Sequence, residues 1–102
     1  MFLNEQIDID RIERAAKKLS IVTHPIRAKI IELLLEKKEM SVTEIFLYLK
    51  ILQSEASHHL NLLKDLGVVR RFRDGKKNIY SVKEEYFEKL IEVAKLLAAT
   101  EK

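Results

Sequence analysis

The sequence has no cysteine, only two glycines and a single proline among its 102 residues. Without cysteine there is no disulfide, no thiolate metal ligand and no thiol redox sensor. So few glycines and prolines, with 34% charged and 47% hydrophobic residues, are typical of a folded, mostly helical chain. No apolar run approaches the length of a membrane span, and the first five residues lack the features of a secretory leader. A cytoplasmic protein with no membrane partner is therefore expected.

Apolar residues recur at three-and-four spacing in the first third of the chain. A stripe that begins with Ile9 and Ile12 predicts a helix over about residues 9–20. Pro25 suits the first position of a second helix, because the backbone N–H that proline lacks has no partner there. That helix is expected to end near residues 37–38.

Two short helices separated by a tight turn are predicted next. Ser41 and Glu44 have the spacing of a capping box, in which each side chain accepts a hydrogen bond from the other residue's backbone N–H. They open a helix that runs to about Leu49. The second of the pair covers about residues 53–66 and stops at Gly67. Together they form a helix-turn-helix.

Two β-prone runs follow, at residues 68–72 and 78–82, and Asp74-Gly75 between them favours a hairpin. Ser81 and Glu84 repeat the capping-box spacing and predict the start of a last helix. The predicted fold is mainly α with a small β-hairpin, in the order α-α-α-α-β-β-α. Residues 1–102 are expected to form one winged helix-turn-helix domain.

The hairpin is the most basic part of the chain. Residues 68–83 hold six lysines or arginines and one acid, for a net charge of +5, although the whole chain carries only +3. A basic patch of this kind favours a phosphate backbone, because each neutralised phosphate releases counterions. The alternative is a solvated hairpin whose cations only protect its edges from pairing. The candidate phosphate or minor-groove contacts are Arg70, Arg71, Arg73, Lys76 and Lys77.

Three segments in unbroken order resemble the ArsR family of winged-helix repressors. They are residues 23–34 with Pro-x-Arg, residues 54–60 with Ser-x-His-Leu, and residues 63–69 with Leu-Gly-Val-Val. The combination is more specific than any one piece, and the resemblance covers about residues 17–83. It implies a homodimer that binds double-stranded DNA, represses genes and releases DNA on a signal. Lys50 departs from the pattern, because the family commonly has glycine there, and this suggests an altered turn.

The resemblance also places the start of the fourth helix where such proteins touch bases. Short polar side chains there can reach base edges and phosphates. One of Ser54 and Ser57 is expected to cap the helix. His59, just before the apolar Leu60, is expected to pack or to contact phosphate rather than to read a base. The DNA-binding candidates on this helix are Gln53, Ser54, Ser57, His58 and Lys64.

Metal sensing is disfavoured by the residues at the usual family positions. Members that sense metals carry a cysteine pair where this chain has Ser41 and Thr43, and hydroxyls do not replace thiolates as ligands. The last helix has no histidine. His58 and His59 are adjacent and project about 100° apart on a helix, so they are not expected to chelate one ion. We therefore expect no metal and no cofactor, and leave open a small-molecule or protein effector.

The last helix has an apolar face wider than one core-facing stripe, which favours a second copy as partner. The first helix is expected to join it in the dimer contact. The candidate interface residues are Ile9, Ile12, Leu19, Tyr86, Phe87, Leu90, Val93, Ala94 and Leu97.

The expected function is that of a sequence-specific DNA-binding transcriptional regulator, a repressor acting as a homodimer. The alternative is a winged-helix protein-interaction module without DNA binding. An enzyme is not expected, because the sequence shows no nucleophile-base-acid spacing, no glycine-rich nucleotide loop and no carboxylate pair in a plausible cleft.

Overall fold

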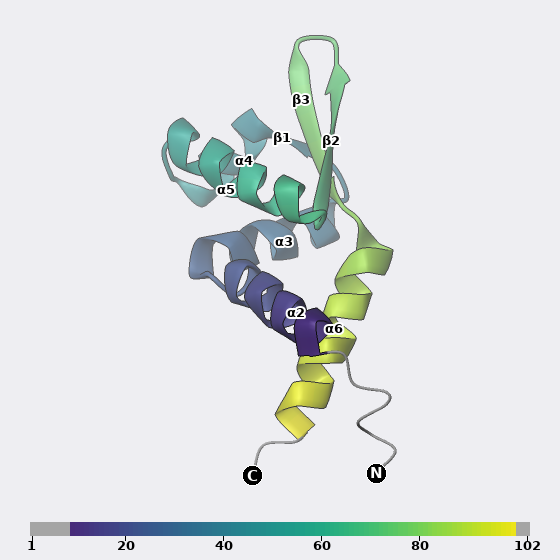
Figure 1. Ribbon diagram of the computed structural model, residues 1–102. Coiled ribbons are helices and arrows are strands. Elements are labelled where there is room, and N and C mark those ends of the chain that lie inside the picture. Colours follow the sequence, from purple (N-terminus) through teal and green to yellow (C-terminus); the bar gives the residue numbers. More distant parts are fainter. Residues whose placement is uncertain (1–8, 100–102) are drawn as a thin grey trace, which may run out of the picture.

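The computed structural model describes residues 9–99 and confirms the predicted order of elements, with one added strand (Figure 1). The elements are α2 (Ile9–Val22), α3 (Pro25–Lys37), β1 (Met40–Ser41), α4 (Val42–Leu49), α5 (Gln53–Leu66), β2 (Val69–Asp74), β3 (Lys77–Val82) and α6 (Glu84–Ala99). α4 and α5 form the helix-turn-helix, and β2 with β3 forms the hairpin, which we call the wing. None of the described helices is long and apolar enough to cross a membrane.

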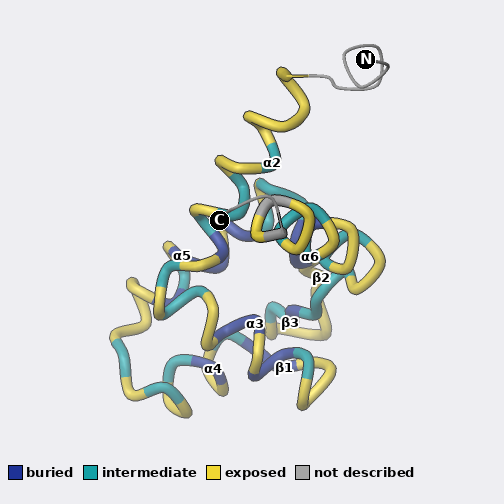
Figure 2. Tube along the Cα trace, turned by 90° about the horizontal axis from the view of Figure 1, so that it is seen from below, coloured by how far each residue is buried: buried dark blue, intermediate teal, exposed yellow. Residues whose placement is uncertain are grey.

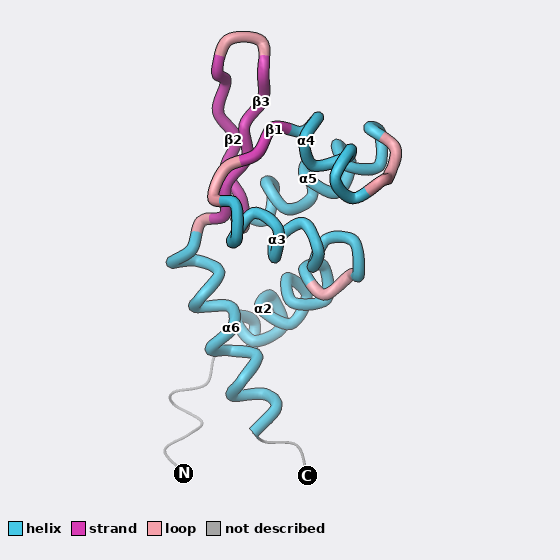
Figure 3. The backbone as a smooth tube through the Cα atoms, turned by 180° about the vertical axis from the view of Figure 1, so that it is seen from behind, coloured by secondary structure: helices cyan, strands magenta, loops and turns pink. Residues whose placement is uncertain are grey.

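The sheet is antiparallel, with strand order β1-β3-β2. β1 pairs Met40 with Tyr80 and Ser41 with Ile79. A strand of two residues has no alternation to detect, so the sequence pattern did not predict it. β1 anchors the base of the wing, whose tip extends past the helices (Figure 3).

The wing is longer than predicted, because β2 extends to Asp74, which pairs with Lys77. The loop is therefore Gly75-Lys76 rather than Asp74-Gly75. Gly75 has a φ of 65°. A glycine with positive φ at the first of two loop positions matches the hairpin turn of type II′.

The two predicted capping boxes have different outcomes. At the start of α4 the box is confirmed, since Glu44 Oε1 accepts from the Ser41 N–H at 2.8 Å and Ser41 Oγ from the Glu44 N–H at 3.1 Å. The box at Ser81 is wrong. Ser81 lies in β3 opposite Arg70, and α6 begins only at Glu84. Ser81 is thus paired within the sheet and does not cap α6.

The turn between α4 and α5 depends on Lys50, which has left-handed dihedral angles of φ 58° and ψ 45°. Its backbone N–H donates to the Phe46 carbonyl. A lysine in this conformation costs on the order of 1 kcal/mol relative to glycine. Lys50 therefore has a left-handed backbone of the kind that glycine adopts readily.

The core lies between α3, α4, α5 and the base of the wing (Figure 2). Its largest fully buried side chains are Ile30, Leu34, Ile45, Leu60, Leu63, Val68 and Val69. Both residues after the Gly67 stop are in this set, so the end of α5 and the start of β2 are held together. This packing fixes the helix-turn-helix relative to the wing.

Candidate nucleic-acid interface

The start of α5 is capped by Glu55, not by a serine. Leu52 is the N-cap residue, with an extended backbone, and Glu55 Oε1 accepts from its N–H at 3.0 Å. Among residues 9–99, Ser54 and Ser57 make no such cap, so the expectation that one of them would is wrong. Both hydroxyls are left for other partners.

The predicted residues of α5 share one face. At about 100° per residue they fall within an arc of about 140°, opposite the buried side of the helix. Gln53, Ser54 and His58 are exposed, and Ser57 and Lys64 are half-buried. The buried side is formed by Ala56, His59, Leu60 and Leu63. The start of α5 therefore presents short polar groups on a helix whose other face is fixed in the core.

Two residues at this surface, Asn61 and Leu52, were not identified from the sequence. Asn61 is exposed at the centre of the same arc, four residues after Ser57 and eight after Gln53, and this spacing alone would have found it. Leu52 is 68% exposed at the N-cap position, where serine, threonine, aspartate or asparagine is usual. The signal in the sequence was the apolar Leu52 at a position where a helix cap is usually polar.

His59 is buried in the packing between helices, as expected, with 8% of its surface exposed. Its Nδ1 lies 3.1 Å from Nη1 of Arg27 on α3. Its ring centroid is 5.0 Å from that of His24 and 5.4 Å from that of His58. Burial, followed by the nearby Arg27 guanidinium, lowers the pKa of His59 below its ordinary value.

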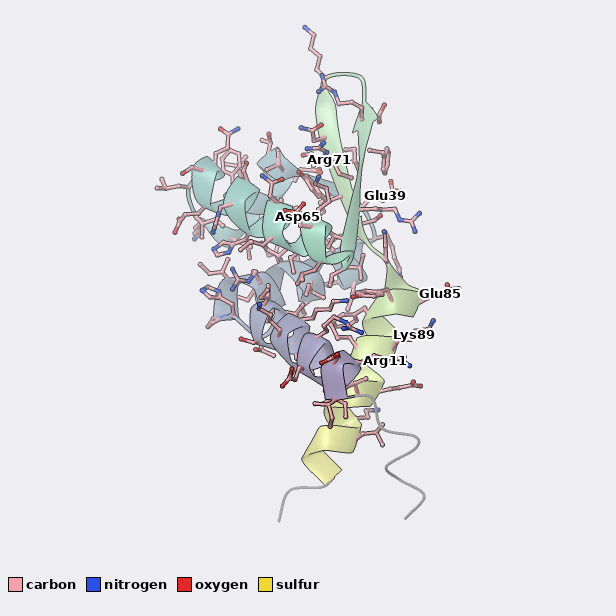
Figure 4. All side chains as sticks on the ribbon, viewed as in Figure 1. Arg11, Glu39, Asp65, Arg71, Glu85 and Lys89 are labelled. Atoms are coloured by element: carbon pink, nitrogen blue, oxygen red, sulfur yellow. The ribbon has the colours of Figure 1, made fainter. Side chains whose placement is uncertain are left out.

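The register of the wing places its cations on different faces. Arg71 pairs with Tyr80 and Arg73 with Asn78. Since side chains alternate along a strand, Arg71 and Arg73 share the face of the buried Val69 and Tyr80, where α5 packs. Figure 4 shows Arg71 beside the wing, on the side of α4 and α5. Arg73 also donates from Nε to the Gly75 carbonyl at 3.4 Å.

Arg70 points the other way. It lies opposite Ser81 and lines a groove with Glu84 and Glu85 at the start of α6. Lys76 is in the loop at the tip, and Lys77 is beside it. All five predicted wing cations are exposed. Arg71 and Arg73 share one face, Lys76 and Lys77 lie at the tip, and Arg70 lies at the base on the opposite face.

Part of the wide apolar face of α6 is covered within the chain. Tyr86, Leu90 and Val93 line a shallow groove with α2, and Lys18 Nζ lies 5.2 Å from the centre of the Tyr86 ring. Leu90 is only 5% exposed. Arg11 of α2 and Lys89 of α6 border this groove, and Figure 4 shows them where the two helices meet. Leu90 is therefore less available to a partner than its spacing suggested, whereas Tyr86 and Val93 remain half-buried.

The other side of α6 faces an open apolar groove of about 390 Å³ between α2, α3 and α6. Phe87, Ile91 and Ala94 line it from α6, and Leu19 lines it from α2. The apolar lining also includes Val22, Ala28, Ile31 and Leu35. Farther along α2, Ile9 and Ile12 are 61% and 38% exposed. The side chain of Leu97 is outside the part of the chain that is described.

No group of three or more metal-binding side chains occurs within the described part of the chain. His24, His58 and His59 lie in succession, yet His24 Nδ1 accepts from the Ile26 N–H at 3.2 Å and His59 Nδ1 meets Arg27. Nδ1 of His24 and Nδ1 of His59 are thus engaged in hydrogen bonds. The cluster is built from packing and hydrogen bonding.

Comparison with known sequences gives consistent matches. A model of the bacterial regulatory proteins of the arsR family matches residues 24–71. An uncharacterized HTH-type transcriptional regulator of Methanocaldococcus jannaschii is 33% identical over 85 residues, which cover 83% of this chain and 96% of that protein. The transcriptional repressor PagR of Bacillus anthracis is 32% identical over 93 residues, which cover 91% of this chain and 93% of PagR.

Comparison with solved structures gives the same result. The crystal structure of PagR aligns with a TM-score of 0.70 and covers 85% of this chain and 99% of that one. A homodimeric winged helix-turn-helix DNA-binding domain from Mycobacterium bovis, solved by NMR, is 25% identical and aligns with a TM-score of 0.67. That alignment covers 89% of this chain and 81% of the other.

Proposed function

This chain belongs to the arsR family of bacterial regulatory proteins, and we infer from this that it is a DNA-binding transcriptional regulator, a repressor that acts as a homodimer. Like the relatives that it matches, it is a transcriptional regulator and not an enzyme. The cytoplasm is its proposed location, because operator DNA is accessible there. The single observation that best supports base recognition is the exposed polar face at the start of α5.

In the proposed mechanism, α5 of each protomer enters a major groove. The two grooves lie about 34 Å apart, one helical turn of DNA, so the operator is a near-palindrome. The base readers are Gln53, Ser54, Ser57, His58 and Asn61. Asn61 adds the side chain type that pairs with adenine through two hydrogen bonds, and Leu52 adds an apolar contact for a thymine methyl group. Lys64 contacts the phosphate backbone.

The wing contributes charge rather than sequence preference. Arg71, Arg73, Lys76 and Lys77 are exposed around one face and the tip, where they can follow phosphates or enter the minor groove. Arg70 lines a groove with Glu84 and Glu85 at the base of the wing, away from the tip, so we assign it a weaker contribution than the sequence suggested. Operator binding then blocks transcription by occupancy.

The dimer surface that we propose is the apolar groove between α2, α3 and α6. Phe87, Ala94 and Leu19, with Ile91 beside them, line this groove and have no full cover within the chain. Ile9 and Ile12 extend the surface along α2. Tyr86, Leu90 and Val93 support it from behind, because they pack α6 onto α2. A second copy would bury the groove residues together with Ile9 and Ile12 at one contact.

Sedimentation tests the dimer. The wild-type chain is expected to be a dimer at micromolar concentration. Ile91→Glu places a charge in the groove and is expected to give monomers. Leu96→Glu is the matched control, because Leu96 is on α6 and 67% exposed but does not line the groove. A wild-type monomer, or equal behaviour of the two variants, would contradict the proposed contact.

DNA titration tests the regulator. Promoter-region and random duplexes are titrated at two salt concentrations, and the affinity is followed with its salt slope. We expect tight binding that prefers one region and weakens steeply with salt, because many phosphates are neutralised by a pair of wings. Weak, salt-independent binding to every duplex would instead favour the protein-interaction module.

A further inference from the structure

One arginine connects the recognition helix to two other helices. Arg27, near the start of α3, donates from Nε to the Ile21 carbonyl at 2.6 Å. Ile21 is in the last turn of α2, where backbone carbonyls lack a partner within the helix. The same guanidinium reaches His59 of α5 through Nη1. Arg27 thus links α2, α3 and α5 at the corner that lies beneath α5 (Figure 1).

The link to His59 depends on one protonation state. A guanidinium has only hydrogen-bond donors, so His59 Nδ1 must accept and cannot carry a proton. The neutral ring therefore holds its proton on Nε2.

We propose that Arg27 and His59 are a positioning pair, which holds the start of α5 at the angle needed to read bases and releases it when His59 is protonated. This inference rests on the proposed base-reading role of α5. His59 lies six residues after Gln53, or about 9 Å along the helix axis. A small rotation at the pair therefore displaces the reading residues at the end of the helix.

The surroundings of His59 oppose a second cation. A protonated ring would turn an N–H toward Arg27 and place two positive charges in contact. His24 from the α2–α3 corner and His58 from α5 face it as further basic groups, and Glu55 is the one acid among the described residues that acts on it in the opposite direction. Protonation thus breaks the hydrogen bond and drives the ring out of its packed position.

The test compares two neighbouring histidines. His59→Asn keeps an acceptor oxygen close to the position of Nδ1 but does not titrate. His58→Asn is the matched control, because His58 is adjacent and titratable but is not bonded to Arg27. For each chain the affinities for the operator and for a scrambled duplex are measured at constant salt between about pH 7.5 and pH 5.5. Their ratio is followed because added positive charge strengthens both complexes alike.

In the wild type, the ratio is expected to fall below the His59 pKa by up to about tenfold per pH unit for each protomer, the limit for one proton, and by up to about a hundredfold for the dimer. His59→Asn is expected to keep its ratio, and His58→Asn to keep the fall even where its affinity is lower. Arg27→Gln retains a donor for Nδ1 without the charge, so the fall should move to higher pH. A wild-type ratio that stays constant through the pH range in which His59 is protonated, or an equal fall in His59→Asn, would overturn the proposal.

A measurement without DNA separates this pair from the proposed function. In NMR spectra of the free protein, the amide signals of Gln53 and Ser54 should follow the titration of His59 in the wild type and not in His59→Asn. If these signals stay fixed while His59 titrates, the pair does not position α5. If they move as expected but no duplex is preferred at neutral pH, the positioning pair stands and the base-reading role fails.

Discussion

The start of α5 and the tip of the wing are both exposed and polar, but they differ in what lies behind them. Ala56, Leu60 and Leu63 on the back of α5 are fully buried, and His59 beside them is tied to Arg27. Beyond Val69, every residue of β2 is exposed. Base recognition needs side chains held in a fixed geometry, whereas phosphate attraction needs only charge at roughly the right distance. The two regions fit these different requirements.

The largest expected difference between the regions is in stability. Leu60→Ala removes a fully buried side chain behind the reading face and should cost about 2–5 kcal/mol of unfolding free energy. Phe72→Ala in the wing, where the ring is 42% exposed, should cost less than about 1 kcal/mol. Urea unfolding at one fixed protomer concentration measures both, since dimerisation makes the midpoint depend on concentration. Equal losses would mean that the wing is as firmly held as α5.

The next difference is in DNA specificity. Asn61→Ala should cost about 1–3 kcal/mol on the operator and little on random DNA, because it removes contacts with base edges. Arg73→Ala combined with Lys76→Ala should weaken all duplexes alike and lower the salt slope by about one unit per lost phosphate contact. Titrations of both duplexes at several salt concentrations separate the effects. A wing variant that changes sequence preference would exchange the proposed roles.

A smaller effect is expected at the junction of α5 with its turn. Leu52→Ser supplies the missing cap hydroxyl and should stabilise the protein by about 1 kcal/mol, while it loses preference for thymine at one operator position. Leu47→Ser is the control, because Leu47 is similarly exposed at 64% but lies inside α4. It should give no gain. Stabilisation without any change in preference would remove Leu52 from the DNA contacts.

The smallest effect is the pH dependence of stability. The folded pKa of His59 is lowered from 6.5, so the unfolded chain binds its proton first. This contribution to stability is complete above about pH 6.5 and is lost as the pH falls toward the folded pKa. The capping hydrogen bond from the Ser41 backbone lowers the pKa of Glu44 below 4.5, so its contribution is lost only in more acidic solution. In urea titrations, His59→Asn should therefore remove the loss of stability that begins near pH 6.5. It should leave the loss due to Glu44, in more acidic solution, unchanged.

Much of the fold was predictable because local signals agreed with the packing. The capping box at Ser41, the Gly67 stop and the apolar periodicity fixed the helix-turn-helix closely. β1 was not predictable, since two residues carry no period. Ser81 was misassigned because a capping-box spacing does not reveal that a strand has already paired the residue.

The candidate site was predictable in type but not in arrangement. Helical spacing puts the polar residues of α5 on one face, and it would also have included Asn61. Spacing could not show that Arg70 and Arg71 point to opposite faces, because that depends on the register of the wing. Nor could it show that α2 of the same chain covers Leu90, while Phe87 lines an open groove. These distinctions come from tertiary contacts, which periodicity does not encode.

The central claim is that α5 reads sequence and the wing supplies charge. Competition titrations test it most directly, with an operator selected from a random duplex library and its scrambled form at two salt concentrations. They use the wild type, Gln53→Ala with Asn61→Ala, and Arg73→Ala with Lys76→Ala. The account predicts that the α5 variant loses the preference but keeps the salt slope, and that the wing variant keeps the preference but has a shallower slope. The opposite assignment, or loss of both properties in both variants, would contradict it.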